Sequence, residues 1–584
     1  MLKECLEVFK SDLENNRQQI IDAYVPAEGT YVIVSPKGDS FEIKDYFDIK
    51  YDKKDKKLLG KTNINFNKIC NYDYNSILDI QKAIDRKKII QSNNYLSFII
   101  KQESLKNGKL TEECIDNYYS ILSNFEKKYK NDKKSLTLYK LVEGEIGKVN
   151  IELLEKIKLW IKNNIFNLNI EMSGKNYLKI FFDYTLQNYI NEGKRHLIPN
   201  IYNKNNYNIE LDNEIYGLPN NNMALNSKKP YLENKTRKNT LPYLIDAEEV
   251  QLQKEFFDYL MNEVSLGKTN VFIDLDKKII DVKENGKLPE NDFNGLFLKL
   301  KKGKEVEIHY YDAITSYKSI LKKELDIKNI LELDLDSKLN QKYVEYYNNL
   351  KKKEDVQKIL DEVFFNRYLI KNYFTDPGNI STQDNILINS LLTARNSIFK
   401  WIYNGIDKNS DNGIATILDK VSLNLIKGSI NDGDITKAGH QFNLRWSLKE
   451  YFKGGKKMPE ILKDLTTLRT KINAEKTDRF ENDEEYYFSI GQLVYYFLSK
   501  SKSKKKMQSF INTFISIQKD IYVKEKLRSL YKSYNYDMEI NSNRIRNLYA
   551  MIELYKPYSK IDKDMVIAGF LHSSLIYEKS EGDK

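Results

Sequence analysis

The sequence predicts an α+β protein: a mixed α/β amino-terminal body with polar loops, then a helical region that ends in a carboxy-terminal helical bundle. Its 584 residues are enough for about two to four domains. Short β-type runs alternate with helical patterns up to about residue 340, and beyond that point long helical stretches follow one another without strand signals. With 42 Tyr and 26 Phe, the chain is too aromatic to stay disordered throughout.

Hydrophobic spacing predicts the elements of the amino-terminal domain, residues 1–340. The first 25 residues carry apolar side chains at helical spacing and predict an amphipathic helix. Two β-type runs flank Pro36-Lys37-Gly38, which predicts a turn. Further helices are predicted at residues 76–90, 111–130 and 150–165. The predicted strands are residues 30–34, 41–43, 178–185 and 271–282, with a hairpin of 296–300 and 306–310.

The remainder of the chain is predicted to be helical. Residues 341–457 form a helical connecting region, and residues 458–584 form the bundle. Tyr486–Leu498 is apolar nearly all round, so it is expected to be a central buried helix. Two apolar stripes at helical spacing are expected to pack in the same bundle: Val523, Leu527, Leu530 and Tyr534, and Ile545, Leu548, Tyr549 and Ile552.

Composition also restricts where the protein works. Cys5, Cys70 and Cys114 are far apart, so no disulfide framework and no zinc-binding cysteine spacing is predicted. No apolar run approaches the roughly 18 residues of a membrane span, and the first residues do not open a signal peptide. We therefore expect a cytoplasmic protein without a membrane partner.

The net charge of +11 has two explanations. A basic chain often binds a polyanion such as nucleic acid. However, only 12 of the 94 basic residues are Arg, and Lys, Asn, Ile and Tyr are all abundant, as expected of an A/T-rich genome. Each Arg runs against that codon bias, so Arg237, Arg544 and Arg546 carry more weight than any single Lys.

No catalytic motif is found, and no enzyme activity or cofactor is predicted. The four histidines, His196, His309, His440 and His572, are isolated from one another. Three Asp-x-Asp pairs could in principle hold Mg²⁺. They are Asp274 with Asp276, Asp334 with Asp336, and Asp432 with Asp434. Asp276 leads into lysines at a strand end and Asp334 lies in a helical pattern, so a structural role is favoured for these pairs.

Residues 216–238 are the most informative segment. Gly217, Pro219 and three consecutive Asn cannot continue a helix or a central strand, so a long polar loop is predicted. Its amides are expected to read base edges, its cations to hold phosphates and its tyrosine to stack. These residues are Asn220, Asn221, Asn222, Lys228, Lys229, Tyr231, Lys235, Arg237 and Lys238. One alternative is a solvated loop of an A/T-rich genome, and another is that Lys228–Lys238 contacts guide RNA or a neighbouring subunit rather than target DNA.

Three segments, in the same order along the chain, support a family resemblance. Residues 226–237 read NSKKPYLENKTR. Earlier in the chain, residues 71–76 read NYDYNS and residues 92–98 read SNNYLSF. Near the end, residues 487–499 read YFSIGQLVYYFLS. Together they resemble the large subunit of type I-B CRISPR surveillance complexes (Cascade), the Cas eight-b family. The cysteine-based zinc site of some family members has no counterpart here.

The resemblance implies a non-catalytic, bacterial antiviral-defence protein. Its implied partners are the guide RNA (crRNA), target double-stranded DNA, and the backbone, 5′-handle-binding and small subunits of Cascade. Such a subunit recognises the protospacer-adjacent motif (PAM), aids duplex opening and recruits a separate helicase–nuclease. Because guide pairing supplies most of the sequence specificity, the protein has to read only a few base pairs. The carboxy-terminal bundle resembles the small subunit.

The bundle carries a second set of predicted contacts. Residues 491–560 hold 14 Lys and Arg against 5 Asp and Glu. We expect the run after the buried helix, together with two arginines, to face a DNA strand or the guide–target duplex. These residues are Lys500, Lys502, Lys504, Lys505, Lys506, Arg544 and Arg546. Helix capping by one or two of the lysines is the alternative.

Met458 is a predicted internal translation start. Gly454-Gly455-Lys456-Lys457 precede it, and their codons can contain the GGAGG of a bacterial ribosome-binding site. Translation from Met458 would give the bundle as a separate product. The alternative is that the two glycines simply end one helix before Pro459 starts the next.

Two other functional classes stay open. One is a Mg²⁺-dependent nuclease that uses the Asp-x-Asp pairs. The other is a structural or scaffold protein whose Lys/Asn loops bind nothing. A nucleic-acid-binding protein differs from the second class because its affinity falls steeply with salt.

Overall fold

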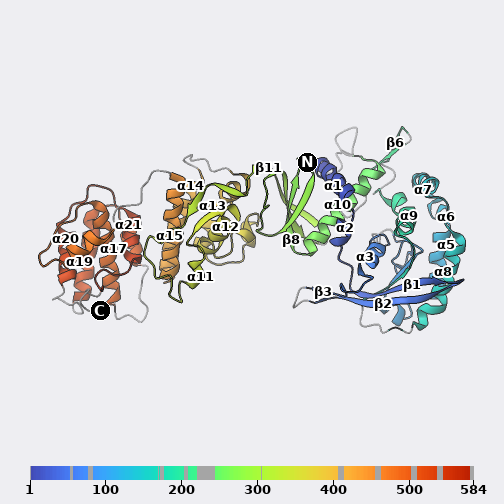
Figure 1. The fold of residues 1–584 in the computed structure, drawn as a ribbon, viewed down its shortest axis with the longest axis horizontal. Helices are drawn as coiled ribbons and strands as arrows, with labels where there is room; N and C mark the ends of the chain where they lie inside the picture. Colours follow the sequence, from blue (N-terminus) through green and yellow to red (C-terminus); the bar gives the residue numbers. More distant parts are fainter. Residues whose placement is uncertain are drawn as a thin grey trace. The chain divides into compact units, whose positions relative to one another are not determined.

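The computed structural model of the chain describes residues 2–52, 57–76, 83–168, 170, 176–202, 208–212, 214–219, 244–303, 306–405, 413–453, 462–501, 510–535 and 543–578. Mixed sheets occupy the amino-terminal part and helices dominate the rest, so the predicted α+β class is confirmed (Figure 1). The chain forms two compact units. Unit 1 is Met1–Glu284 with Leu296–Asp312, and unit 2 is Asn285–Gly295 with Ala313–Lys584. Among the described residues, no helix is both long and apolar enough to cross a bilayer.

The first sheet of unit 1 has the strand order β3-β2-β1-β5-β4. Its strands are β1 (Gly29–Lys37), β2 (Ser40–Asp52), β3 (Lys57–Leu59), β4 (Ser97–Lys101) and β5 (Tyr177–Phe182). β1 and β5 are parallel, and the other neighbouring strands are antiparallel. The apolar runs of β1 and β5 are buried on both faces, as expected of strands covered by helices on both sides.

Helices cover both faces of this sheet. α3 (Phe66–Tyr74) and α9 (Leu186–Leu197) pack on the face that carries Lys179 and Phe181. α5 (Glu112–Ser123) and α8 (Ile151–Asn164) pack on the opposite face, which carries Phe98 and Phe182. The neighbouring helices are the short α4 (Gln102–Lys106) and α6 (Phe125–Tyr129) and the longer α7 (Lys133–Ile146).

The second sheet of unit 1 has the order β11-β10-β8-β9. Its strands are β8 (Lys268–Asp274), β9 (Ile279–Glu284), β10 (Phe293–Lys302) and β11 (Val306–Tyr317). α1 (Leu2–Asn15), α2 (Gln19–Asp22) and α10 (Ala247–Ser265) share one hydrophobic core with it. The predicted hairpin is confirmed as β10 and β11. The predicted single strand 271–282 is instead the β8–β9 hairpin, with Lys278 in the left-handed region at the turn (φ 53°).

Two further predictions are corrected. The described part of the predicted helix 76–90 consists of turns and bends. The Asp85 carboxylate accepts hydrogen bonds from the backbone N–H groups of Lys87, Ile89 and Ile90, and such a local bond competes with a helix. Strand signals do not end at residue 340 either, because β13 (Asn349–Lys352) pairs with β12 (Ile320–Asp326).

Unit 2 is otherwise helical. Its first helices are α11 (Gln341–Val344), α12 (Lys353–Ile359), α13 (Asn385–Asn404), α14 (Ile414–Asn431) and α15 (Ile435–Lys453). The later ones are α16 (Thr466–Asn473), α17 (Asp483–Ser499), α18 (Ile511–Ser516), α19 (Asp520–Tyr534), α20 (Asn543–Leu554) and α21 (Lys563–Leu571).

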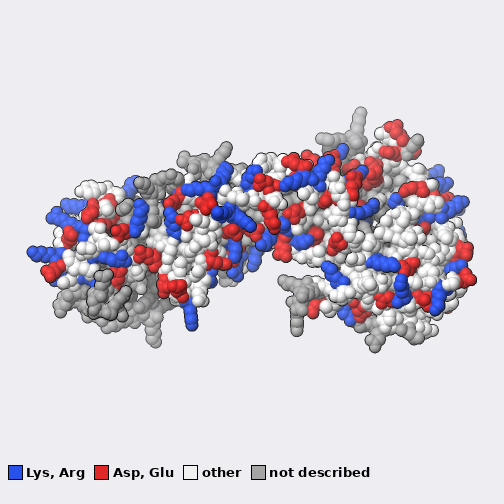
Figure 2. All heavy atoms as spheres, in the orientation of Figure 1, with Lys and Arg blue, Asp and Glu red and all other residues white. Residues whose placement is uncertain are grey.

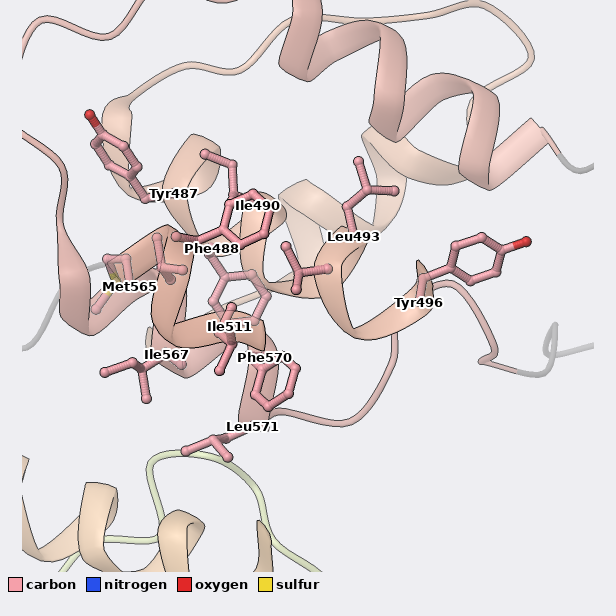
Figure 3. Packing of buried hydrophobic residues seen from close by; sticks show 14 of the residues in the cluster. Tyr487, Phe488, Ile490, Leu493, Tyr496, Ile511, Met565, Ile567, Phe570 and Leu571 are labelled. Atoms are coloured by element: carbon pink, nitrogen blue, oxygen red, sulfur yellow. The ribbon is translucent and has the colours of Figure 1, made fainter. Parts of the chain in front are cut away.

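α17 is the buried helix that the sequence predicts, and it lies at the centre of the largest core (Figure 3). It crosses α21 closely, because a Cβ at Gly491 would collide with the Val566 carbonyl and one at Gly569 with the Phe488 carbonyl. This core runs from Ile330 to Ile576, so it joins helices on both sides of the predicted boundary at residue 457.

Candidate nucleic-acid interface

The loop with the most predicted contacts lies outside the described residues, and so do most of the bundle lysines and Met458. The loop residues concerned are Asn220, Asn221, Asn222, Lys228, Lys229, Tyr231, Lys235, Arg237 and Lys238. The bundle lysines concerned are Lys502, Lys504, Lys505 and Lys506. Of the predicted contact residues, the structure places Lys500, Arg544 and Arg546.

The described residues on either side of the loop form a fixed stem. Gly217 and Ile245 exchange two backbone hydrogen bonds of 2.9 and 3.1 Å. The Tyr202 hydroxyl donates to the carbonyl oxygens of Ile215 (2.6 Å) and Ile245 (3.1 Å). Tyr202 and Ile245 are buried in a small core with Leu138 and Val250, from α7 and α10. The loop therefore leaves the body of unit 1 and returns to it at one anchored place.

The stem itself is acidic. β6 (Ile209–Leu211) and β7 (Glu214–Tyr216) form a hairpin before the loop, with exposed carboxylates at Glu210, Asp212 and Glu214. Figure 2 shows acidic side chains over this hairpin. Carboxylates repel a phosphate backbone, so the predicted phosphate contacts of the loop would have to form away from its stem.

Lys500 is the first residue after α17 and is half-buried. Its ammonium lies over the rings of Tyr496 and Tyr577, at 5.3 and 5.6 Å from their centroids. These cation–π contacts hold it at the carboxyl end of α17, where a positive charge also favours the helix dipole. The structure thus supports the capping role that the sequence left as the alternative for one lysine of the run.

The two predicted arginines of α20 differ from each other. The Arg544 guanidinium donates to the Asn473 side chain and to the backbone carbonyls of Ile576 and Glu578. These bonds hold the backbone of Ile576 and Glu578 against α16 and α20, so a structural role is favoured for Arg544. Arg546 is exposed and bonds only to Asn543 of the same helix within the described residues, at 2.8 Å, so its guanidinium remains accessible.

A basic face on α19 was not recognised in the sequence. Its residues recur every three or four positions and are defined here as the α19 face: Lys519, Tyr522, Lys526, Ser529 and Ser533. Tyr522 is 53% exposed, and Lys526 lies over the Phe510 ring at 5.3 Å from its centroid. Neither lysine forms an ion pair with a described residue. The predicted apolar stripe of α19 is buried beside this face, at Val523, Leu527 and Leu530.

The α19 face combines the groups that a nucleic-acid strand uses. Lysines attract phosphates, the Ser529 hydroxyl can donate to them, and an exposed tyrosine can stack on a base. The Ser533 hydroxyl instead donates to the Ser529 backbone carbonyl at 2.9 Å. Elsewhere on α19 the basic side chain is paired: Arg528 forms an ion pair with Glu553 at 2.7 Å. On the molecular face shown in Figure 2, basic and acidic side chains are interspersed. The α19 face is therefore distinguished by lysines that have no ion-pair partner among the described residues, and not by a high density of positive charge.

Two of the three segments that carry the family resemblance are described, and both lie in hydrophobic cores. Asn93 donates its backbone N–H to the Ser76 carbonyl (3.1 Å), which joins the two halves of the first segment. Tyr72 stacks on Tyr189 with ring centroids 4.0 Å apart. The second segment is the buried face of α17. The described part of the resemblance therefore concerns residues that build the fold.

The Asp-x-Asp pairs serve as turn and cap residues. Asp274 Oδ1 accepts the backbone N–H groups of Asp276 (3.0 Å) and Lys277 (2.9 Å). Asp334 makes the same bond to Asp336 at 3.2 Å and lies in a turn, so its predicted helical position is wrong. Asp434 caps α15 through the Lys437 N–H at 3.0 Å. Such bonds to backbone donors are typical of Asx turns and helix caps.

The described histidines contact neighbouring side chains. His196 Nε2 lies 2.7 Å from the Lys128 ammonium. His440 lies between the Tyr347 hydroxyl (2.7 Å) and the side-chain oxygen Oδ1 of Asn340 (2.8 Å), and burial lowers its pKa to about 4. Within the residues described, no group of three or more His, Cys, Asp or Glu side chains is arranged to hold a metal ion.

Comparisons with protein-family models, with curated proteins and with solved structures give no match.

Proposed function

We propose that this chain is a non-catalytic, nucleic-acid-binding large subunit of a type I-B Cascade complex. The single structural observation that supports nucleic-acid binding is the α19 face, where Lys519 and Lys526 stand beside an exposed tyrosine without a carboxylate partner among the described residues. The assignment to Cascade rests on the three resembling segments. PAM recognition, duplex opening and recruitment of a helicase–nuclease belong to the same proposal.

In this proposal the two units have separate tasks. The loop anchored by Gly217 and Ile245 in unit 1 would reach the PAM, with its asparagines reading base edges. The cations of the bundle in unit 2 would hold a strand or the guide–target duplex by phosphate attraction, independently of sequence.

The test is binding of the full chain to single strands, duplex DNA and guide RNA at a series of salt concentrations. A nucleic-acid subunit loses affinity steeply and linearly on a logarithmic salt scale. A scaffold protein would show no such slope. Mg²⁺-dependent cleavage by the chain alone would instead favour the nuclease. Neighbouring genes for the other Cascade subunits and a CRISPR array would separate Cascade from other nucleic-acid-binding assemblies.

The internal start at Met458 is a further part of the proposal. The untouched gene, expressed with a carboxy-terminal tag, should give a second, shorter band that disappears when the Met458 codon is replaced by one that cannot initiate. Because the core of unit 2 also contains Ile426, Phe442 and Trp446, a product starting at Met458 would lack part of that core. We therefore expect the short product to be recovered bound to another subunit.

A further inference from the structure

A groove of about 510 Å³ lies between α13 and α14 in unit 2, and α18 contributes to one wall. The two helices run in opposite directions, since Ile386 near the start of α13 contacts Gly428 near the end of α14. A Cβ at Gly428 would lie 3.3 Å from the Ile386 side chain, so a larger residue there would press on α13. The groove therefore follows from a close helix crossing.

One stripe of α14 supplies most of the polar lining. Lys420, Asn424, Lys427 and Asn431 are spaced four, three and four residues apart, so they lie on one face over three turns. The two lysines are about 10 Å apart along the helix axis at 1.5 Å per residue. Ammonium and amide groups therefore alternate along the groove, and the two ammonium groups can each contact a different phosphate of one strand.

The opposite wall adds the side-chain amide of Asn389, while the Thr393 hydroxyl donates to the Asn389 backbone carbonyl at 2.7 Å. Asn389 and Thr393 of α13 line the groove one turn apart. Ile386 and Val421 supply apolar surface, against which a sugar can pack. Among the described residues that line the groove there is no carboxylate and no aromatic ring. The lining can therefore hold a phosphate backbone, but it offers no platform on which a base could stack.

The positive charge in the groove is not neutralised. Lys420 and Lys427 form no ion pair with any residue that the structure describes. Burial and the nearby Lys563 ammonium lower the pKa of Lys427. A phosphate beside it would oppose this shift.

One short helix, α18, and the residue before it contact both the groove and the α19 face. The Asn512 amide of α18 lines the groove and donates to the Lys427 carbonyl. Phe510, just before the same helix, lies beneath Lys526 of the α19 face. Asn512 Oδ1 is buried without a hydrogen-bond partner among the described residues. One strand could thus contact both surfaces in succession.

We infer that the α13–α14 groove binds the sugar–phosphate backbone of a single nucleic-acid strand, without reading its bases. This inference rests on the proposed function and deepens it. A duplex is too wide to enter a groove between two packed helices, and a free nucleotide would find no aromatic surface for its base. The occupant supported by the lining is therefore a strand held through two or more phosphates.

The test uses the full chain with both groove lysines replaced, Lys420→Ala and Lys427→Ala together, and an oligothymidylate probe. Each lost phosphate contact lowers the salt slope for single strands by about 0.7, so the pair should lower it by about 1.4 and weaken binding about 25-fold at 0.1 M salt. The same loss is expected with oligoadenylate, because no base is read. Lys338→Ala with Lys371→Ala, two exposed lysines of unit 2 outside the groove, is the control of equal charge.

The outcomes separate the two proposals. If the groove variant binds like the control variant while the wild-type chain binds with a steep salt slope, the groove inference is wrong and the proposed function stands. If the wild-type chain shows no salt-dependent binding at all, the proposed function fails, and the groove inference fails with it. An equal loss on a blunt duplex would overturn the assignment to a single strand. An unchanged melting temperature confirms that the variant is folded.

Discussion

Helices α8 and α14 both carry lysines at helical spacing, but only the lysines of α8 form ion pairs with described carboxylates. On α8, Lys158 and Lys162 lie 3.2 and 3.1 Å from Asp116, and Lys162 also contacts Glu112 at 3.0 Å. On α14, Lys420 and Lys427 face amides and hydroxyls in a groove. The hydrogen bond to Glu112 raises the pKa of Lys162, whereas burial lowers that of Lys427.

This difference helps to decide whether lysines in a lysine-rich chain reflect nucleic-acid binding or only the codon bias of an A/T-rich genome. An A/T-rich genome supplies many lysines, and α8 shows them as an ordinary surface on which each charge has a local partner. Lysines left without carboxylates beside hydroxyls and amides have no such explanation. A lysine that has no carboxylate partner and also lies in a polar groove or beside an exposed aromatic ring is therefore a better candidate for binding than a high count of charges in the sequence.

The largest expected effect is on stability and concerns two buried cations, Arg445 and Lys449, which pair with carboxylates in unit 2. Asp564 accepts from Arg445 Nε at 3.1 Å and also pairs with Lys449, and these two cations keep its pKa low. Asp564→Asn leaves Arg445 and Lys449 with the partly exposed Asp419 as their remaining carboxylate partner, at 3.0 and 3.3 Å. The free energy of unfolding should therefore fall by about 3 kcal/mol, the lower end of the range for a broken buried pair. Chemical denaturation of the full chain measures this.

The exposed Asp336→Asn is the control for that substitution and should be nearly silent. If Asp564→Asn were equally silent, buried pairing in unit 2 would be worth no more than the surface pairs of α8, and the comparison would break down.

The next effect concerns His440, which is kept neutral by burial rather than paired. Its pKa of about 4 lies below the roughly 6.5 of an unfolded histidine, so the unfolded chain binds the extra proton first. Lys342 also lowers this pKa, and Asp434 opposes the shift. Stability should therefore fall by about 1–3 kcal/mol as the pH drops from 6.5 to 4.

Thermal melts of the wild-type chain and of His440→Gln over this range measure the effect. The variant lacks the titrating ring, so its loss of stability between these pH values should be smaller by that amount. Identical pH profiles would contradict the neutral state assigned to His440.

The next prediction concerns the α19 face, where substitutions are expected to change the free energy of nucleic-acid binding rather than that of unfolding. Replacing Lys519 and Lys526 together by Ala should weaken single-strand binding about 25-fold at 0.1 M salt, about 2 kcal/mol, since two phosphate contacts are lost. Stability should change little, because neither lysine has an ion-pair partner among the described residues. Fluorescence anisotropy with a labelled oligonucleotide checks this, and a variant that binds like the wild type would remove the α19 face from the interface.

The smallest effect is expected on α8. Replacing Lys158 and Lys162 by Ala removes the same number of charges as the α19 substitution, but these charges are already neutralised by carboxylates. Nucleic-acid affinity should change less than twofold, and each surface pair should contribute about 0.2–1 kcal/mol to stability. A 25-fold loss of affinity in this variant would show that total charge, not pairing, determines binding.

Hydrophobic spacing was sufficient to predict the class of the fold and several of its elements. The buried helix α17, the strands β1 and β2 and the β10–β11 hairpin were predicted because their apolar residues repeat at a helical or strand period. The helix predicted at 76–90 failed in its described part, since the side chain of Asp85 bonds to three backbone N–H groups that a helix would need. Spacing carries no information about such local competition.

The candidate binding surfaces were much harder to predict. The α14 stripe and the α19 face are visible in the sequence only as polar residues at helical spacing, and α8 shows the same pattern. What separates them is that, among the described residues, no carboxylate of a neighbouring helix pairs with Lys420, Lys427, Lys519 or Lys526, whereas Asp116 and Glu112 pair with the lysines of α8. Such pairing depends on tertiary packing. The sequence instead favoured Arg544, whose donors the fold uses for carbonyls near the end of the chain.

The most direct test of this account is to map where a nucleic-acid backbone touches the full chain. A single strand with photoreactive groups attached to its phosphates, crosslinked to the protein and analysed by mass spectrometry, reports the residues beside the backbone. The account predicts crosslinks on residues 414–431 and 511–534 and none on residues 151–164. Crosslinks concentrated on 151–164, or spread in proportion to lysine content, would contradict it.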